Sequence, residues 1–112
     1  MNSRTNFRRL AQWRRGLLFG GTALLLASAA QAADVFKGRE VYQQQCQICH
    51  GRAGVSPLAG VPDLSRGEGM MQTDPALLES IKGGLDAMPG YIGILSDRDI
   101  LDVIAFMRTL AR

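Results

Sequence analysis

The segment CQICH, Cys46 to His50, constrains this sequence more than any other, because it contains both cysteines and the only histidine of the 112 residues. On a helical turn, thiols at positions i and i+3 lie on one face. They are then close enough to react with two substituents of one flat molecule, and the His50 imidazole is placed to reach the centre of that molecule. We expect the chemistry of the protein to start at this segment.

The spacing Cys-x-x-Cys-His is the signature of c-type haem attachment. In such a site the thiols of Cys46 and Cys49 add to the two vinyl groups of the haem, and His50 binds the iron. The sequence therefore predicts one haem c, attached through two thioether bonds that make the cofactor a permanent part of the fold.

Two other uses of a Cys-x-x-Cys pair are less well supported. A thioredoxin-like thiol pair follows a strand in an α/β fold, and this chain has no clear strand pattern. A structural zinc site needs four ligands, but beyond Cys46, Cys49 and His50 the chain has no further cysteine or histidine. The short motif also arises by chance, but chance does not supply the export signal that haem attachment outside the cytoplasm requires.

Residues 1–32 have the pattern of that export signal. Several arginines precede an apolar run, GLLFGGTALLLASAA, which ends in the small-residue pattern AQA. The run covers residues 16–30 and is shorter than the roughly 20 residues of a membrane span. We therefore expect a signal peptide that is cleaved after Ala32 and a mature domain at residues 33–112. An uncleaved membrane anchor is the alternative.

Removal of the leader reverses the sign of the net charge. The whole sequence has 13 Lys and Arg against 10 Asp and Glu, but its first 32 residues hold five of the basic residues and none of the acidic ones. The mature domain keeps eight basic and ten acidic residues, a net charge of −2. The basic character belongs to the export signal, so it does not indicate nucleic-acid binding.

The mature domain is small enough that a core of side chains alone gives marginal stability. A Cys46–Cys49 disulfide would close a very short loop and would constrain the unfolded chain little. A bound cofactor would stabilise the domain far more.

Hydrophobic patterning predicts three helices. The first runs over about residues 35–45 after Asp34 as N-cap, and the second lies in TDPALLESIKGG with Thr73 or Asp74 as N-cap. The last begins after Ser96 and carries a broad apolar stripe. Residues 51–69, rich in Gly, Pro, Ser and Asp, predict a long loop that wraps around another group. The stripe of the last helix consists of Ile100, Val103, Ile104, Met107 and Leu110.

Over its mature length the chain resembles the small class I c-type cytochromes. The resemblance is carried by KGREVYQQQCQICHG, AMPGY and LSDRDILDVIAFMRTL, in that order. It implies an all-α, small cytochrome c fold in which three to four helices and long loops wrap around one covalently bound haem. Gly38 is costly inside a helix and indicates a close helix crossing. The resemblance agrees, because this family packs its first and last helices together at such a glycine, and we expect Phe106 to meet Gly38 and Tyr42 there.

An iron held by His50 has a second axial position, which no other histidine can take. Met88 lies in DAMPGYIG, where Pro and Gly prevent regular structure. The resemblance implies that this methionine is the distal ligand, because the Met-Pro pair matches the position of that ligand in the family. Met70, Met71 and Lys82 are the alternative ligands. Met107 is not among them, because it belongs to the apolar stripe of the last helix. The resemblance further implies a proline carbonyl that accepts the free N–H of His50. Pro62 is the first candidate for this carbonyl and Pro57 the second.

These ligands predict a function. With both axial positions filled, the iron has no open site for a substrate or dioxygen and can only accept and return one electron. We expect a periplasmic monohaem electron carrier, not an enzyme, between redox partners such as a membrane respiratory complex or a periplasmic oxidoreductase. We expect no nucleic-acid partner and, after cleavage, no stable membrane insertion.

Two alternatives to the carrier remain open. One is a haem subunit, or a haem protein that binds a gas or peroxide at a labile sixth position, and the other is a thiol–disulfide oxidoreductase. Around the haem edge of a carrier we expect a mostly uncharged partner surface formed by Gln47, Ile48, Pro89, Tyr91 and Ile92. For Tyr91, a role as a packing residue is the alternative.

Overall fold

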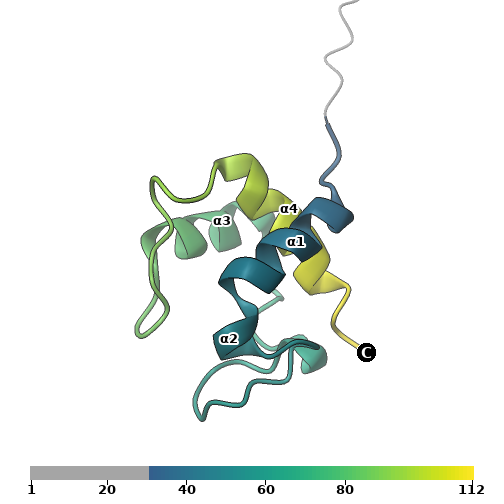
Figure 1. Ribbon diagram of the computed structural model, residues 1–112, viewed down its shortest axis with the longest axis vertical. Coiled ribbons are helices and arrows are strands. Elements are labelled where there is room, and N and C mark those ends of the chain that lie inside the picture. The colour runs from purple at the N-terminus through teal and green to yellow at the C-terminus, as the bar shows by residue number, and fades with distance from the viewer. Residues whose placement is uncertain (1–30) are drawn as a thin grey trace, which may run out of the picture. The chain divides into compact units, whose positions relative to one another are not determined.

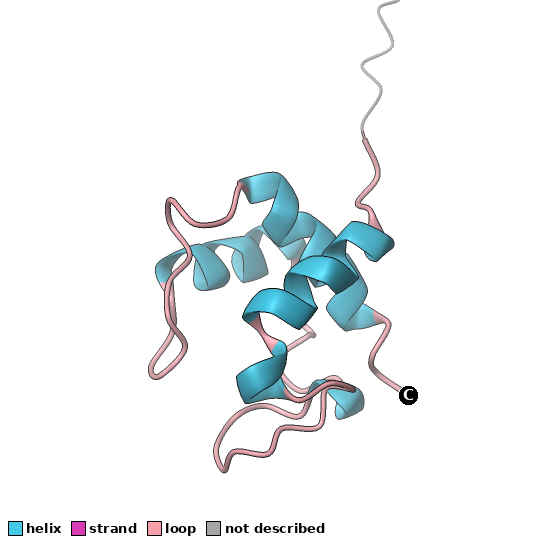
Figure 2. Ribbon diagram, in the orientation of Figure 1, coloured by secondary structure: helices cyan, strands magenta, loops and turns pink. Residues whose placement is uncertain are grey.

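The computed structural model describes residues 31–112, so the predicted leader lies outside the described part except for its last two residues. Within this part the fold is all-α and contains no strand (Figures 1 and 2). The prediction of three to four helices is confirmed. In chain order the elements are α1 (Val35–Gln45), α2 (Gln47–His50), the 3-10 turn η1 (Leu64–Arg66), α3 (Asp74–Gly83) and α4 (Asp97–Arg108).

The helix starts expected from the sequence are confirmed by their caps. The Asp34 side chain accepts the backbone N–H groups of Phe36 and Lys37 at the start of α1. The Thr73 hydroxyl caps α3, whose first turn contains a proline, and Ser96 and Asp99 form a reciprocal capping box at α4. Each cap satisfies N–H groups that have no partner within the helix.

Helices α1 and α4 cross closely at Gly38, as the resemblance implied (Figure 1). A Cβ atom at Gly38 would lie only 1.9 Å from the backbone oxygen of Asp102 on α4. Beside this contact, the rings of Tyr42 and Phe106 pack with their centroids 5.2 Å apart. The absence of a side chain at one residue therefore lets the two backbones touch.

Asp102 closes the same helix pair at its outer end. Its buried carboxylate accepts the backbone N–H of Asp34 at 2.8 Å and lies 3.1 Å from Nε of Arg98. A buried carboxylate is stable only when it is paired and hydrogen-bonded. Asp102 therefore ties the start of α1 to α4.

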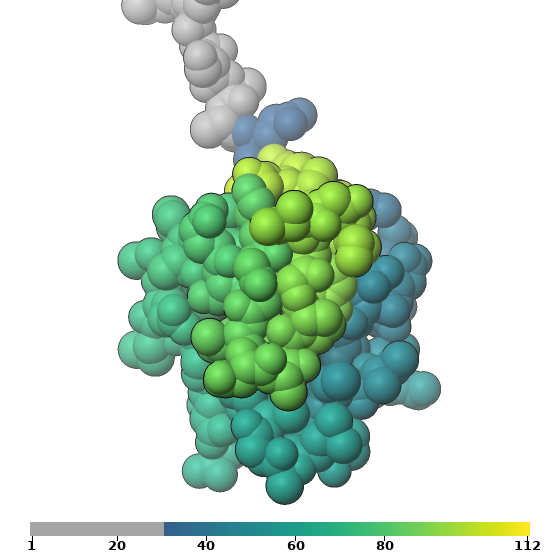
Figure 3. Space-filling view, turned by 90° about the vertical axis from the view of Figure 1, so that its left-hand side faces the viewer, coloured from purple at the N-terminus to yellow at the C-terminus, as the bar shows by residue number. Residues whose placement is uncertain are grey.

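The apolar stripe of α4 forms most of the core. Ile100, Val103 and Ile104 are almost completely buried and pack with Tyr42 of α1. Leu110, the last residue of the predicted stripe, is only partly buried because it lies beyond the end of α4. The predicted loop over residues 51–69 is confirmed apart from the short turn η1. In Figure 3 the segment between α3 and α4 lies on the face toward the viewer.

Replacement of Gly38 tests the helix crossing. We expect Gly38→Ala to lower the free energy of unfolding by about 1–3 kcal/mol or more, because overpacking of this order results when a methyl group is forced into a filled space. Gly83→Ala is the matched control, because Gly83 is also helical and its added Cβ would meet nothing within 4 Å. Denaturant unfolding of both variants gives the comparison, and equal stabilities would contradict the close crossing.

The Asp99 carboxylate gives a pH-dependent prediction. The pKa of Asp99 is lowered by hydrogen bonds from the Ser96 hydroxyl and then from the Ser96 backbone N–H. A group with a lowered pKa stabilises the fold above its unfolded pKa of about 3.9, and that stabilisation disappears as the pH falls through the folded pKa. We expect Asp99→Asn to lower the unfolding temperature by a few degrees at pH 7, with the difference shrinking below about pH 4.

Thermal unfolding at pH 7 and pH 3 checks this expectation. Glu79→Gln is the control, because it removes an exposed carboxylate in the middle of α3, away from any helix cap. A loss of stability in Asp99→Asn that is the same at both pH values would contradict a role of the ionised carboxylate in the cap.

Candidate haem site

All five residues predicted for the site line one cavity of about 590 Å³. Cys46, Cys49 and His50 come from the end of α1 and from α2, Pro62 from the long loop, and Met88 from the segment after α3. A volume of this size is within the range of cofactor and ligand pockets. Much of the remaining wall is apolar and includes Leu64, Leu77, Ile81, Val103 and Met107.

The short helix α2 presents the cysteines and the histidine. Cys46 ends α1 and begins α2, and its carbonyl accepts the backbone N–H groups of Cys49 and His50 at 3.2 and 3.0 Å. Gly51 then turns the chain with a positive φ of 78°, at a place where a Cβ would lie 1.8 Å from the Val55 oxygen. The sequence therefore folds this segment as one helical turn with the two thiols at i and i+3, as expected.

The electrostatics of Cys46 do not suit thiol exchange. Burial, and to a lesser extent the nearby Cys49, raise the pKa of Cys46 to about 11. A redox-active pair needs an easily formed thiolate and therefore a lowered pKa. This observation disfavours the thiol–disulfide oxidoreductase among the alternatives.

His50 has the properties of a neutral ligand. Burial lowers the pKa of its imidazole, and the backbone carbonyl of Pro62 partly opposes this shift. The Nδ1 atom is buried and makes no hydrogen bond within residues 31–112. The hydrogen bond from the imidazole to Pro62 therefore stays a prediction, while Pro57 is absent from the residues that line the cavity.

Met88 is placed by a tight turn on the end of α3. Leu85 and Met88 exchange two backbone hydrogen bonds of 3.1 and 2.9 Å. Gly84, with φ of 78°, allows this turn to approach so closely that a Cβ there would lie 2.8 Å from the Met88 oxygen. The turn gives Met88 a half-buried position at the cavity, where no helix or strand would have placed it.

Two of the alternative axial ligands lie outside the lining of the cavity. Met71 is 96% exposed, and Nζ of Lys82 is 2.9 Å from Asp97; neither residue lines the cavity. Met70 and Met107 do line it, but both are buried in the hydrophobic core. Met88 is the methionine of the cavity that lies at the edge of the core and not within it.

Both tyrosines of the chain support the segment that carries the motif. The Tyr91 hydroxyl donates to the Gln45 carbonyl at 2.8 Å, directly before Cys46, and the Tyr42 hydroxyl donates to the Gly51 carbonyl at 2.6 Å, directly after His50. Neither contact was expected from the sequence. Only 8% of Tyr91 is accessible, so this residue does not belong to an exposed partner surface, and its alternative role as a packing residue is confirmed.

Comparison with known proteins identifies the family. Residues 33–107 match the family model described as cytochrome c oxidase, cbb3-type, subunit III. The chain is also 30% identical to cytochrome c6 of Synechocystis sp., over 81% of its own length and 78% of that protein. It therefore belongs to the class I c-type cytochromes. The resemblance noted in the sequence is confirmed.

Two further similarities give the range of this family. The solved structure of cytochrome c6 from the diatom Phaeodactylum tricornutum has a TM-score of 0.61 and 26% identity, and covers 70% of this chain and 95% of that one. The cytochrome c subunit of the quinone-dependent alcohol dehydrogenase from Gluconobacter oxydans is 33% identical, but the match covers only 20% of that longer subunit. The fold is thus that of a small cytochrome, and it also occurs within subunits of redox enzymes.

The lining residues fit a covalently attached haem c, the cofactor of this family. Two thiols, a buried imidazole nitrogen without a hydrogen-bond partner, and a thioether meet in a space with largely apolar walls. The predicted haem c is confirmed, and the family supports a monohaem electron carrier. Within residues 31–112 of the cytochrome, no helix is long and apolar enough to cross a membrane.

Removal of either tyrosine hydroxyl tests the support of the motif. We expect Tyr42→Phe and Tyr91→Phe each to lower the free energy of unfolding of the haem-loaded cytochrome by about 0.5–1.5 kcal/mol, because each leaves a carbonyl without its partner. Ser80→Ala is the control, since its hydroxyl bonds only the Ala76 carbonyl of its own helix. Denaturant unfolding provides the measurement, and tyrosine variants as stable as the control would refute the proposed support.

Proposed function

We propose that this cytochrome carries single electrons between redox proteins in the periplasm, with His50 and Met88 as the axial ligands of its haem iron. The observation that carries the proposal is the meeting of Cys46, Cys49, His50 and Met88 in one cavity, although Met88 is far from the motif in sequence. Signal-peptide cleavage after Ala32 is part of the proposal. An uncleaved leader would instead anchor the domain to the membrane.

Each residue of the site has one role in this proposal. Cys46 and Cys49 hold the cofactor through thioether bonds, and the neutral imidazole of His50 supplies one axial ligand. Met88 supplies the other ligand, a soft thioether that favours Fe(II) and raises the reduction potential. Bound haem supplies a one-electron Fe(III)/Fe(II) couple. Because both axial positions are taken by protein, dioxygen and peroxide have no open position to bind.

The apolar wall adapts the site to electron transfer. Leu77 and Ile81 of α3 and Val103 and Met107 of α4 are buried side chains that line the cavity. Such a wall limits the access of water and lowers the local dielectric constant, which influences the reduction potential. The packed core also holds the ligands in a fixed arrangement, so little rearrangement accompanies a change of oxidation state.

The opening of the cavity provides the surface for redox partners. Ile48, Leu58 and Leu85 line the cavity, yet each is at least half exposed. Ile92 is 73% exposed in the segment that follows Met88. An exposed apolar rim suits the small, short-lived contacts of redox proteins, which bury less than about 1,200 Å². By analogy with the relatives that are parts of redox enzymes, a dehydrogenase or oxidase complex is the proposed type of partner.

Carbon monoxide tests the sixth position of the iron. We expect sharp c-type absorption bands in the reduced cytochrome that carbon monoxide leaves unchanged. In Met88→Ala the position opens, so we expect carbon monoxide to shift these bands and the reduction potential to fall. Visible spectra of the oxidised, reduced and carbon-monoxide-treated proteins give the result.

Three matched variants identify the methionine. Met71→Ala removes an exposed thioether outside the cavity and should leave the cytochrome inert to carbon monoxide. Met70→Leu and Met107→Leu remove the two buried thioethers of the cavity while largely keeping their volume. If Met70→Leu or Met107→Leu bound carbon monoxide while Met88→Ala stayed inert, the methionine replaced in the binding variant would be the ligand instead of Met88. Binding to the unaltered protein would favour a gas- or peroxide-binding function.

A further inference from the structure

The basic residues of the described domain either form a salt bridge or form none. Five of them each form one salt bridge with an acidic side chain. All ten acidic residues of the chain lie within residues 34–102. Three arginines, Arg39, Arg52 and Arg112, take part in none of these salt bridges. Residues 1–30 contain no Asp or Glu that could pair with them. The paired basic residues are Lys37, Arg66, Lys82, Arg98 and Arg108.

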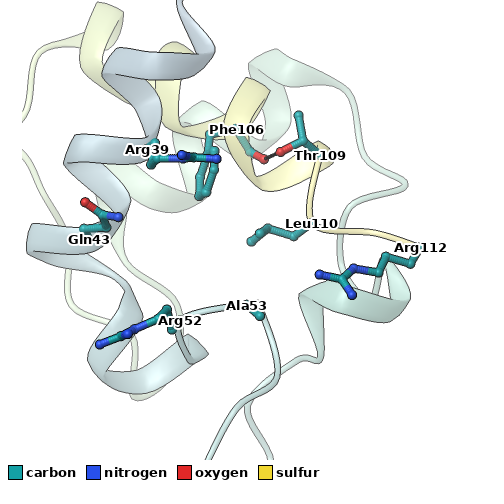
Figure 4. Close-up of a pocket in the computed structure, with 8 residues that line it drawn as sticks. All are labelled: Arg39, Gln43, Arg52, Ala53, Phe106, Thr109, Leu110 and Arg112. Atoms are coloured by element: carbon teal, nitrogen blue, oxygen red, sulfur yellow. Dashed lines mark hydrogen bonds between the residues drawn. The ribbon is translucent and has the colours of Figure 1, made fainter.

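The three unpaired arginines line the same hollow. This hollow, called here the arginine pocket, has a volume of about 330 Å³ and shares no residue with the haem cavity (Figure 4). No carboxylate side chain lines it. Arg39 comes from α1, Arg52 follows α2, and Arg112 follows α4, so these residues line one hollow only in the folded chain. The other lining residues are Gln43, Ala53, Phe106, Thr109 and Leu110.

A cation–π contact and a backbone hydrogen bond position two of the three arginines. The guanidinium carbon of Arg39 lies 5.6 Å from the centroid of the buried Phe106 ring, which also packs on Tyr42. Figure 4 shows the two side chains against each other. A guanidinium that stacks by its face keeps the N–H groups of its edge free for a ligand. The backbone N–H of Arg112 donates to the Ser65 carbonyl at 3.1 Å and joins this residue to the turn η1.

We propose that the arginine pocket binds a small, multivalent anion of the phosphate class. Guanidinium groups bind phosphate oxygens in a bidentate manner, and the three arginines that line this hollow form no salt bridge with an Asp or Glu side chain of the described residues. The volume of the hollow is at the lower end of the range for small-molecule pockets. This size favours a small ligand over a partner protein that would dock on a broad surface. Phe106 and Leu110 add apolar surface to the lining of the hollow.

The position of the pocket couples it to the redox state, on the condition that the proposed function is right and His50 binds the iron. Arg52 is two residues beyond His50, and Gly51 between them is hydrogen-bonded to Tyr42. An anion at Arg52 stabilises the more positive, oxidised site. Linkage makes this effect reciprocal: the oxidised cytochrome binds the anion more tightly than the reduced one, by the same factor by which the bound anion favours oxidation. A coupling factor of about five or more in affinity is common.

Calorimetric titration of the oxidised, haem-loaded cytochrome with inorganic pyrophosphate tests the pocket. At low ionic strength we expect saturable binding of one anion, weakened by added KCl. Arg52→Gln and Arg112→Gln should each weaken binding about tenfold, the usual effect of one lost charge-assisted contact. Both side chains are exposed and form no salt bridge, so the visible spectrum and the unfolding midpoint should stay unchanged.

Arg66→Gln is the matched control. It removes one exposed positive charge outside the pocket, 3.9 Å from Glu68, and should leave the affinity unchanged within about twofold. Absence of saturable binding, or equal weakening by Arg66→Gln, would overturn the proposal. So would binding of a polyglutamate peptide through Arg52 and Arg112 without binding of pyrophosphate, because the surface would then be a docking site for an acidic protein.

The same titration with the reduced cytochrome separates the two proposals. Weaker binding to the reduced form is the expected result and supports both the pocket and its coupling to the iron. Equal affinity of the two forms would refute the coupling but leave the anion site in place. The iron ligands are tested independently by the response to carbon monoxide, so a failure of His50 or Met88 is recognised without reference to the anion.

Discussion

The contact between the backbones of α1 and α4 at Gly38 is the constraint on which the rest of the structure depends. The Gly38 Cα approaches Asp102 so closely that no side chain fits between the helices. The close contact sets the position in space of the end of α1, and therefore of Cys46 and α2, relative to the α4 side chains that line the haem cavity. The Tyr42–Phe106 packing and the buried carboxylate of Asp102 hold the same helix pair on either side of the contact.

The haem-binding segment is fixed at both of its ends by contacts that come from elsewhere in the chain. Tyr42 holds the carbonyl after His50, and Tyr91 holds the carbonyl before Cys46. Tyr91 belongs to the segment that also carries Met88, so one stretch of chain both supports the motif and supplies the proposed second axial ligand. A cytochrome of this size needs few further elements, because the cofactor replaces much of a side-chain core.

The two hollows of the domain differ in their electrostatics. The walls of the haem cavity are largely apolar and include neither a lysine nor an arginine. The arginine pocket is lined by three arginines that form no salt bridge within the described domain. The charged side chains that line the haem cavity, Glu68 and Asp86, are acidic, whereas those that line the arginine pocket are all basic.

The sequence by itself determined the features whose chemistry is local. The five-residue motif, the caps at Asp34 and Ser96, and the apolar stripe of α4 each depend on residues a few positions apart. Gly38 inside a helix indicated a close crossing, and the resemblance to a known family named the two helices that cross. Only the tertiary structure decided that Tyr91 is buried against Gln45, that Lys82 pairs with Asp97, and that Arg39, Arg52 and Arg112 share one pocket. The physical reason is that hydrogen bonds, ion pairs and cavities join residues that are far apart in sequence. No local periodicity records such contacts, which depend on how the helices cross.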